Sequence, residues 1–236
     1  MVSLTRNFKT ETAESKTDTV ATELIDNWDE RVNTFDELGL KEEVIRGIYG
    51  RPFKGFMFSN SARYLMVGYG FERPSTIQQK GILAMLKGND LIAQAQSGTG
   101  KTAVFVISIL QMVDYSSPNC QALVLAPTRE LAFQIHMVMK ALGEYIKFSL
   151  HVCTEGTNIE DNIKILKEGV QVVIGTPDRI NELLKKEYIR SEYCKLLVLD
   201  EADELLLGVF KDHTKEIFKS ISGDTQVEHP AATKFI

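Results

Sequence analysis

Short apolar runs alternate along the chain with longer segments in which apolar residues recur every three or four positions. The first run opens at Leu91, and the others lie at residues 122–126, 148–153, 170–174 and 195–199. Runs of this length between turn residues predict buried strands. Fully apolar strands that alternate with helices predict an α/β fold, a mostly parallel sheet with helices on both faces. Ligands of such sheets bind at the carboxyl ends of the strands.

The segments between the apolar runs predict helices. One begins near Thr76, directly after Ser75, a residue suited to cap it, and another begins at Ala103. Asn158 is expected to cap a further helix in the same way. A single apolar face is made by four residues at helical spacing: Leu131, Ile135, Val138 and Leu142.

The turn between the first run and its helix is rich in small residues: Gln96, Ser97, Gly98, Thr99, Gly100, Lys101 and Thr102. Glycines let successive backbone N–H groups face one anion, and the N-terminus of the following helix adds favourable partial charge. Lys101 is placed to reach the β and γ phosphates of a nucleotide, and the Thr102 hydroxyl to bind Mg²⁺. Ala95 stands where such loops usually carry their first glycine. The alternative is a glycine-rich turn with an incidental Lys-Thr pair, but the strand before it and the helix after it favour a nucleotide site.

Two carboxylates, Asp200 and Glu201, come directly after the last apolar run. Asp200 is placed to reach the Mg²⁺ at Thr102. Glu201 is placed to polarise an attacking water as a general base. The alternative is an acidic helix N-terminus, which the helix macrodipole favours. Because the chain also carries the phosphate loop, we expect Lys101, Asp200 and Glu201 to be catalytic residues.

The composition is that of an ordinary globular protein, with 236 residues, of which 44% are hydrophobic and 25% charged. The first 22 residues are rich in Thr, Ser, Glu and Lys and predict a disordered tail. The net charge of −5 does not indicate nucleic-acid binding. It does not exclude it either, because backbone N–H groups and a few arginines can bind phosphates.

The three cysteines, Cys120, Cys153 and Cys194, and the four histidines show no metal-like spacing. A sparse, odd set of cysteines fits reduced thiols in the cytoplasm, or in the nucleus. We expect each to be a small core residue rather than a nucleophile.

Four motifs occur in one order: Gln-Ser-Gly-Thr-Gly-Lys-Thr at 96–102, Pro-Thr-Arg-Glu-Leu at 127–131, Thr-Pro-Asp-Arg at 176–179 and Asp-Glu-Ala-Asp at 200–203. In this order they resemble the DEAD-box ATP-dependent RNA helicases. The sequence between the motifs resembles that of the family members that act in translation initiation. The resemblance runs from about residue 28 to 227, apart from residues 50–67. It implies a RecA-like P-loop domain that uses ATP and Mg²⁺ and binds RNA.

The resemblance also implies residue roles. Gln78 resembles the glutamine that reads the adenine, and Phe35 the aromatic residue that stacks on it. The nucleotide-binding set is then Phe35, Gln78, Gln96, Ser97, Gly98, Thr99, Gly100, Lys101 and Thr102. The residues expected on the RNA sugar-phosphate backbone are Thr128, Arg129, Gly156, Thr176 and Arg179. Asp203 would couple the nucleotide state to the RNA side. The partners implied are RNA and scaffold proteins of translation initiation, with no membrane.

The chain departs from the family at several positions. Residues 50–67 resemble an insertion, which we interpret as a surface insertion, with a basic-aromatic RNA contact as the alternative. Glu155 and Asp178 stand where the family has glycines, and they add negative charge where RNA phosphate would lie. Like unit charges ~4 Å apart repel by about 1 kcal/mol in a water-like dielectric. After residue 227 the family's Ser-Ala-Thr motif is missing.

We therefore predict a tail at 1–22, a RecA-like ATP-binding domain at 23–227, a divergent end at 228–236, and no second RecA-like domain. The predicted activity is that of an ATP-dependent RNA helicase, an ATP hydrolase, although we do not expect this chain to unwind RNA alone. The alternative is a non-catalytic nucleotide- or partner-binding module that competes with a full-length helicase. A small-molecule kinase is disfavoured by the Pro-Thr-Arg-Glu-Leu and Asp-Glu-Ala-Asp motifs.

Overall fold

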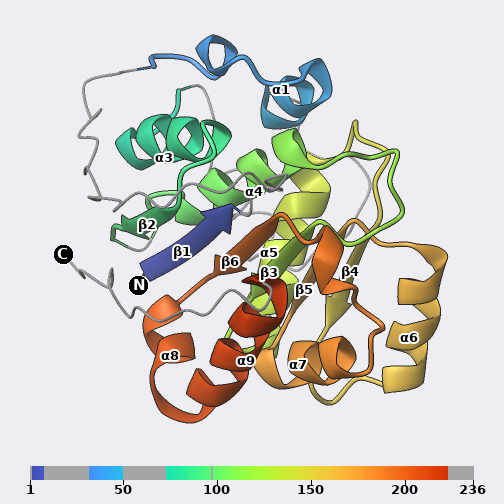
Figure 1. Ribbon diagram of the computed structural model, residues 1–236. Coiled ribbons are helices and arrows are strands. Elements are labelled where there is room, and N and C mark those ends of the chain that lie inside the picture. Colours follow the sequence, from blue (N-terminus) through green and yellow to red (C-terminus); the bar gives the residue numbers. More distant parts are fainter. Residues whose placement is uncertain (1, 8–31, 50–72, 97, 223–236) are drawn as a thin grey trace, which may run out of the picture.

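A central sheet organises the computed structural model, which describes residues 2–7, 32–49, 73–96 and 98–222. Within these residues the sheet has six strands in the order β2-β1-β6-β3-β5-β4 (Figure 1). Their bounds are β1 Val2–Asn7, β2 Leu91–Gln94, β3 Ala122–Leu125, β4 Leu150–Cys153, β5 Val172–Gly175 and β6 Leu196–Leu199.

Most of this sheet is parallel, as the sequence predicts. Strand β3 pairs in parallel with β5 and β6, and β5 pairs in parallel with β4. Strand β1 is antiparallel to both of its neighbours, β2 and β6, so these two run in the same direction. The carboxyl ends of β2 and β6 therefore lie at the same end of the sheet, with β1 between them.

Helices connect the strands and cover both faces of the sheet (Figure 1). The α-helices are α1 Glu42–Tyr49, α3 Thr76–Leu86, α4 Lys101–Met112, α5 Arg129–Leu142, α6 Ile159–Glu168, α7 Pro177–Lys185, α8 Ala202–Leu206 and α9 Lys211–Ser222, with 3₁₀ turns η1 Asp36–Leu38, η2 Ser191–Tyr193 and η3 Gly208–Phe210. The predicted cap at Asn158 is confirmed, since its side chain accepts the Glu160 N–H at 2.9 Å. No helix in the described part of the chain is long and apolar enough to cross a membrane.

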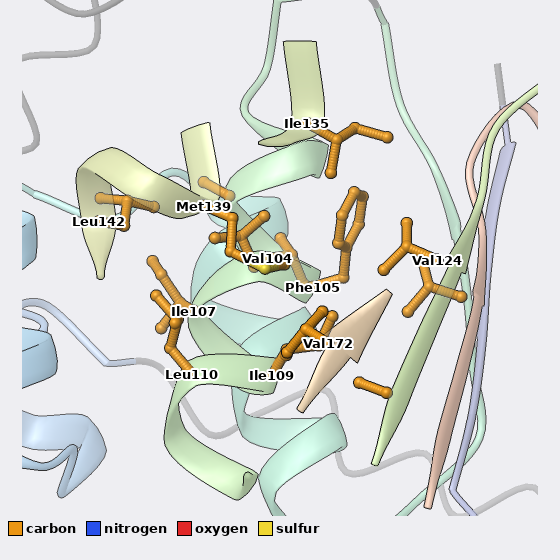
Figure 2. Packing of buried hydrophobic residues seen from close by; sticks show 14 of the residues in the cluster. Val104, Phe105, Ile107, Ile109, Leu110, Val124, Ile135, Met139, Leu142 and Val172 are labelled. Carbon is orange, nitrogen blue, oxygen red and sulfur yellow. The ribbon is translucent and has the colours of Figure 1, made fainter. Parts of the chain in front are cut away.

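The core lies in two layers, one on each face of the sheet. Successive residues of a strand point to opposite faces, so Val124 of β3 joins the cluster formed with α3, α4 and α5. Leu123 and Leu125 of the same strand join the cluster formed with α7, α8 and α9. In the first cluster α4 packs its Phe105 and Ile109 beside residues of α5 and the sheet (Figure 2). The helix whose first turn carries Lys101 is therefore fixed by the core.

Two expectations are wrong. The sequence predicts a disordered tail at 1–22, but residues 2–7 form β1. Average composition misses this segment because a short strand can be held by backbone hydrogen bonds to strands on both sides. The first apolar run is predicted to be a buried strand, but β2 lies at the edge of the described sheet and Ile92 is 42% exposed. The rest of the predicted tail, the insertion 50–67 and the end 228–236 lie outside the described residues.

Candidate functional site

The phosphate loop connects the carboxyl end of β2 to the N-terminus of α4. Gly98 and Gly100 have φ values of 81° and 89°, in the left-handed region that glycine adopts without strain. The Thr99 hydroxyl donates to the Gln96 carbonyl oxygen at 2.8 Å and closes the turn. Ser97, also predicted to bind the nucleotide, lies outside the described residues.

Lys101 is folded back into this loop. Its side chain is buried, and Nζ donates to the carbonyl oxygens of Ala95 and, at 2.9 Å, of Gln96. A lysine ammonium has three donors and a strong affinity for oxygen anions. The loop carbonyls therefore hold the ammonium at the turn where the sequence predicts phosphate oxygens.

Gln78 connects the start of α3 to the phosphate loop. Its amide is buried; Oε1 accepts the Ser75 N–H at 2.8 Å and Nε2 donates to the Gly100 carbonyl oxygen at 3.5 Å. The Ser75 hydroxyl donates to the Thr99 carbonyl oxygen at 3.0 Å. Sequence reasoning missed this connection, although the spacing of Ser75 and Gln78 is that of a capping box. Gln78 thus lies against the loop that would hold the phosphates.

Phe35 is a core residue in the structure. Its ring is 0% exposed and meets the Tyr49 ring edge-on, with centroids 6.1 Å apart. An adenine could stack on this ring only after it left the core. The ring is thus not presented for stacking in this structure, and the role of Phe35 as the base-stacking aromatic residue stays a prediction.

Asp200 and Glu201 follow β6 directly at the same edge of the sheet. Asp200 is 3% exposed, and its Oδ1 accepts the Glu201 N–H at 3.2 Å. Glu201 caps α8 with φ 55°, a left-handed conformation that costs a non-glycine residue about 1–3 kcal/mol. Burial raises the pKa of Glu201, and the nearby carboxylates Glu204, Asp200 and Asp203 raise it further. A raised pKa makes this carboxylate a stronger general base.

Asp203 lies in the first turn of α8 and is exposed. Its predicted role in coupling nucleotide state to RNA stays a prediction.

A cavity of about 500 Å³ lies beyond the carboxyl ends of β3, β4 and β5. It is lined by Pro127, Arg129, Glu155, Gly156, Thr176, Asp178 and Phe210. Three of the residues predicted to bind RNA, Arg129, Gly156 and Thr176, therefore meet in one cavity. The sequence did not predict Phe210 as a site residue. It lies seven positions after the fourth motif, and no sequence pattern links it to the other three motifs.

Two acidic residues from different segments, Glu155 and Asp178, line this cavity. Glu155 is held by its backbone, whose N–H donates to the Thr176 hydroxyl at 3.2 Å. Asp178, in the first turn of α7, lies against His213 of α9, with Oδ1 and Nδ1 2.5 Å apart. The two departures from the family pattern thus place negative charge on the same wall as Arg129.

The remaining predicted RNA residues have structural partners. Thr128 caps α5, since its hydroxyl accepts the Leu131 N–H at 3.2 Å. Arg179 donates from Nη2 to the Thr157 carbonyl oxygen at 3.1 Å and pairs through Nε with Glu182 at 3.4 Å. Arg179 therefore holds the loop after β4 against α7, and it is absent from the cavity wall.

The cysteines are confirmed as core residues. Cys120, Cys153 and Cys194 are free and buried. Burial raises the pKa of Cys153 and of Cys194 to about 12, and that of Cys120 well above its usual value. Thiols with such pKa values are inert as nucleophiles. Among the described residues, no cluster of His, Cys, Asp and Glu could hold a metal ion.

A family model described as DEAD/DEAH box helicase matches residues 75–234, more than half of the chain. The chain belongs to this family.

Curated relatives extend the match. The chain is 48% identical over 206 residues to a Drosophila melanogaster protein named Eukaryotic initiation factor 4A, with 87% of this chain and 47% of the relative covered. It is 45% identical over 221 residues to the Yarrowia lipolytica ATP-dependent RNA helicase eIF4A, with 94% and 51% covered. The chain thus spans about half the length of the curated relatives it matches.

Solved structures support the RecA-like domain assignment. A DEAD box protein from the hyperthermophile Methanococcus jannaschii superposes with a TM-score of 0.65 at 28% identity, over 80% of this chain and 47% of that chain. S. cerevisiae Dbp5 bound to RNA and ADP BeF3 also gives a TM-score of 0.65, at 31% identity, over 79% and 43%. The predicted fold class is therefore confirmed.

Gly100→Ala should destabilise the domain more than Gly39→Ala does. Both glycines have positive φ, so alanine at either position costs about 1–2 kcal/mol of backbone strain. A Cβ at Gly100 would also lie 2.4 Å from Nε2 of Gln78, whereas one at Gly39 would meet nothing within 4 Å. Urea unfolding of both variants measures the difference, and equal losses of stability would contradict the packing of Gln78 on the loop.

Glu201→Gln should stabilise the fold at neutral pH. Because the folded pKa of Glu201 is raised, its ionised form is disfavoured in the folded state, and this cost is present above that pKa. The stabilisation should disappear as the pH falls through the folded pKa toward the unfolded value, where Glu201 is protonated in both states.

Glu187→Gln is the matched control, because Glu187 is an exposed glutamate with a similar φ of 58°. Melting temperatures of both variants between pH 4 and pH 8 test the prediction. A gain in stability for Glu201→Gln that is independent of pH, or that is shared by Glu187→Gln, would contradict it.

Proposed function

We propose that this chain is the ATP-binding domain of a DEAD-box RNA helicase of the kind that acts in translation initiation. The observation that carries the proposal is that the Lys101 loop and the Asp200-Glu201 pair follow the carboxyl ends of β2 and β6, which run in the same direction and end at the same level of the sheet. The names of its relatives, initiation factor 4A and ATP-dependent RNA helicase, support the choice. Scaffold proteins of translation initiation are the proposed partners, in the cytoplasm or the nucleus.

The residues present fit ATP and Mg²⁺. The loop offers backbone N–H groups at a helix N-terminus and a buried ammonium that donates to carbonyl oxygens, and Asp200 supplies a buried carboxylate. Lys101 would bind the β and γ phosphates, and Thr102 and Asp200 would hold Mg²⁺. Gln78, fixed against Gly100, would contact the adenine. Mg²⁺, when bound, neutralises charge on the phosphates.

Glu201 would act as the general base of ATP hydrolysis. Its carboxylate accepts a proton from the attacking water as the water oxygen bonds to the γ-phosphorus and the bond to ADP breaks. Burial and the neighbouring carboxylates raise the pKa of Glu201, and the raised pKa makes it better able to accept this proton.

The cavity beyond β3, β4 and β5 would contact the RNA sugar-phosphate backbone. Arg129 and the backbone around Gly156 and Thr176 supply the groups that bind phosphate. Glu155 and Asp178 on the same wall repel phosphate, so we expect RNA binding that is weaker than this wall would otherwise give.

These two carboxylates also favour a second candidate function. A non-catalytic module would bind nucleotide or a partner protein and compete with a full-length helicase. Weakened RNA contact is compatible with this role, because RNA would no longer stimulate turnover.

Turnover of ATP, with and without single-stranded RNA, distinguishes the two functions. The helicase domain should hydrolyse ATP with stimulation by RNA, and Glu201→Gln should abolish turnover while ATP binding is kept. Lys101→Ala should remove nucleotide binding in calorimetry, because the phosphates lose their main cationic partner. Unchanged ATP affinity in Lys101→Ala would refute the site, and binding without any turnover would establish the non-catalytic module.

Removing the two carboxylate charges should tighten RNA binding. Glu155→Gln with Asp178→Asn removes two repulsive terms of about 1 kcal/mol each, so the affinity should rise about tenfold or more at low salt. The control is Glu160→Gln with Asp161→Asn in the first turn of α6, which changes the net charge equally on exposed residues that do not line the cavity. Fluorescence anisotropy with a single-stranded RNA measures both. Equal gains in the two variants would show a general charge effect and refute the local one.

A further inference from the structure

Strand β1 holds an unusual position in the sheet. It lies between β2 and β6, the two strands that lead into the phosphate loop and into Asp200 (Figure 1). It is antiparallel to both, whereas the pairs formed among β3, β4, β5 and β6 are parallel. Among the described residues, β1 is also the strand through which β2 is hydrogen-bonded to the rest of the sheet.

The register of β1 aligns the two halves of the nucleotide site. Leu4 is opposite Ile92 of β2 on one side and Leu199 of β6 on the other. Ile92 and Leu199 therefore lie at the same level of the sheet, and the chain enters the phosphate loop and the Asp200-Glu201 pair within a few residues of that level. Adjacent strands are about 4.8 Å apart, so one intervening strand sets β2 and β6 about 10 Å apart.

The sequence of β1 indicates that backbone pairing holds it. Its six residues, Val-Ser-Leu-Thr-Arg-Asn, include four polar ones, whereas β6 is Leu-Leu-Val-Leu. Because β1 is antiparallel to both of its neighbours, it does not belong to the βα units that form the parallel strands. A segment held by its ladder is sensitive to the loss of backbone donors.

From this arrangement we infer that β1 is a positioning element of the nucleotide site. As a spacer, β1 fixes the separation and the level of the phosphate loop relative to Asp200 and Glu201, although β1 itself contributes no predicted nucleotide ligand. Without it, β2 would lose its strand partner or pair with β6 directly at half the separation. In either case the separation and level of the phosphate loop relative to Asp200 and Glu201 would change, and we expect nucleotide affinity to fall with it. The inference rests on the proposed ATP binding.

Leu4→Pro tests the ladder, because proline removes a backbone donor from a strand paired on both sides. We expect the dissociation constant of a fluorescent ATP analogue with Mg²⁺ to rise at least about tenfold. Leu4→Val, which keeps the N–H, should bind like the unsubstituted chain. An unchanged dissociation constant in Leu4→Pro would overturn the inference.

A pair of cysteines tests the register without weakening the ladder, and it covers the case in which Leu4→Pro does not fold. Leu4→Cys with Ile92→Cys joins two opposed residues. A disulfide needs Cα atoms within about 7 Å. Leu4→Cys with Gln94→Cys is the control, two residues out of register, and the three native cysteines are buried. We expect only the first pair to cross-link, and the cross-linked protein to bind the analogue as tightly as the reduced one.

The remaining outcomes are distinct. Equal or absent cross-linking in the two pairs, or loss of nucleotide binding on cross-linking, would overturn the role of β1. The proposed function would still stand in these cases if the unsubstituted chain binds the analogue normally. Failure of the unsubstituted chain to bind the analogue would refute the proposed function, and the inference with it.

Discussion

The alignment of strand ends is the constraint on which the site depends. A phosphate loop and a carboxylate pair that are about a hundred residues apart in the chain become one site only if β2 and β6 run in the same direction and end at the same level. The backbone ladder through β1 supplies both conditions. The core beneath α4 then holds Lys101 and Thr102 at that edge, and Gln78 fixes the start of α3 to the loop.

The same edge of the sheet carries a second, electrostatically different region. The cavity beside β3, β4 and β5 combines Arg129 with the carboxylates of Glu155 and Asp178. In the proposed RNA contact, the local charge of this wall would therefore matter more than the net charge of the chain. The pairing of Asp178 with His213 ties this charge to α9, an element that carries none of the family motifs.

Sequence patterns predicted most of the fold because its strands are short, apolar runs and its helix starts carry caps such as Ser75 and Asn158. The phosphate loop and the Asp200-Glu201 pair were predictable because their chemistry requires fixed local spacing. Three features depend on contacts between distant segments and were not predictable in this way. Phe35 is buried by its surroundings, β1 is ordered by its neighbours, and Phe210 meets the cavity through tertiary packing.

The most direct test of the central claim is the effect of Mg²⁺ on ATP affinity in calorimetry, compared between the unsubstituted chain and Asp200→Asn. If the phosphate loop and Asp200 form one site, Mg²⁺ strengthens ATP binding in the unsubstituted chain and does so much less in Asp200→Asn. Asp203→Asn, which removes an exposed carboxylate three residues away, should keep the full effect. An equal Mg²⁺ effect in all three proteins would contradict the account, because Asp200 would then lie outside the nucleotide site.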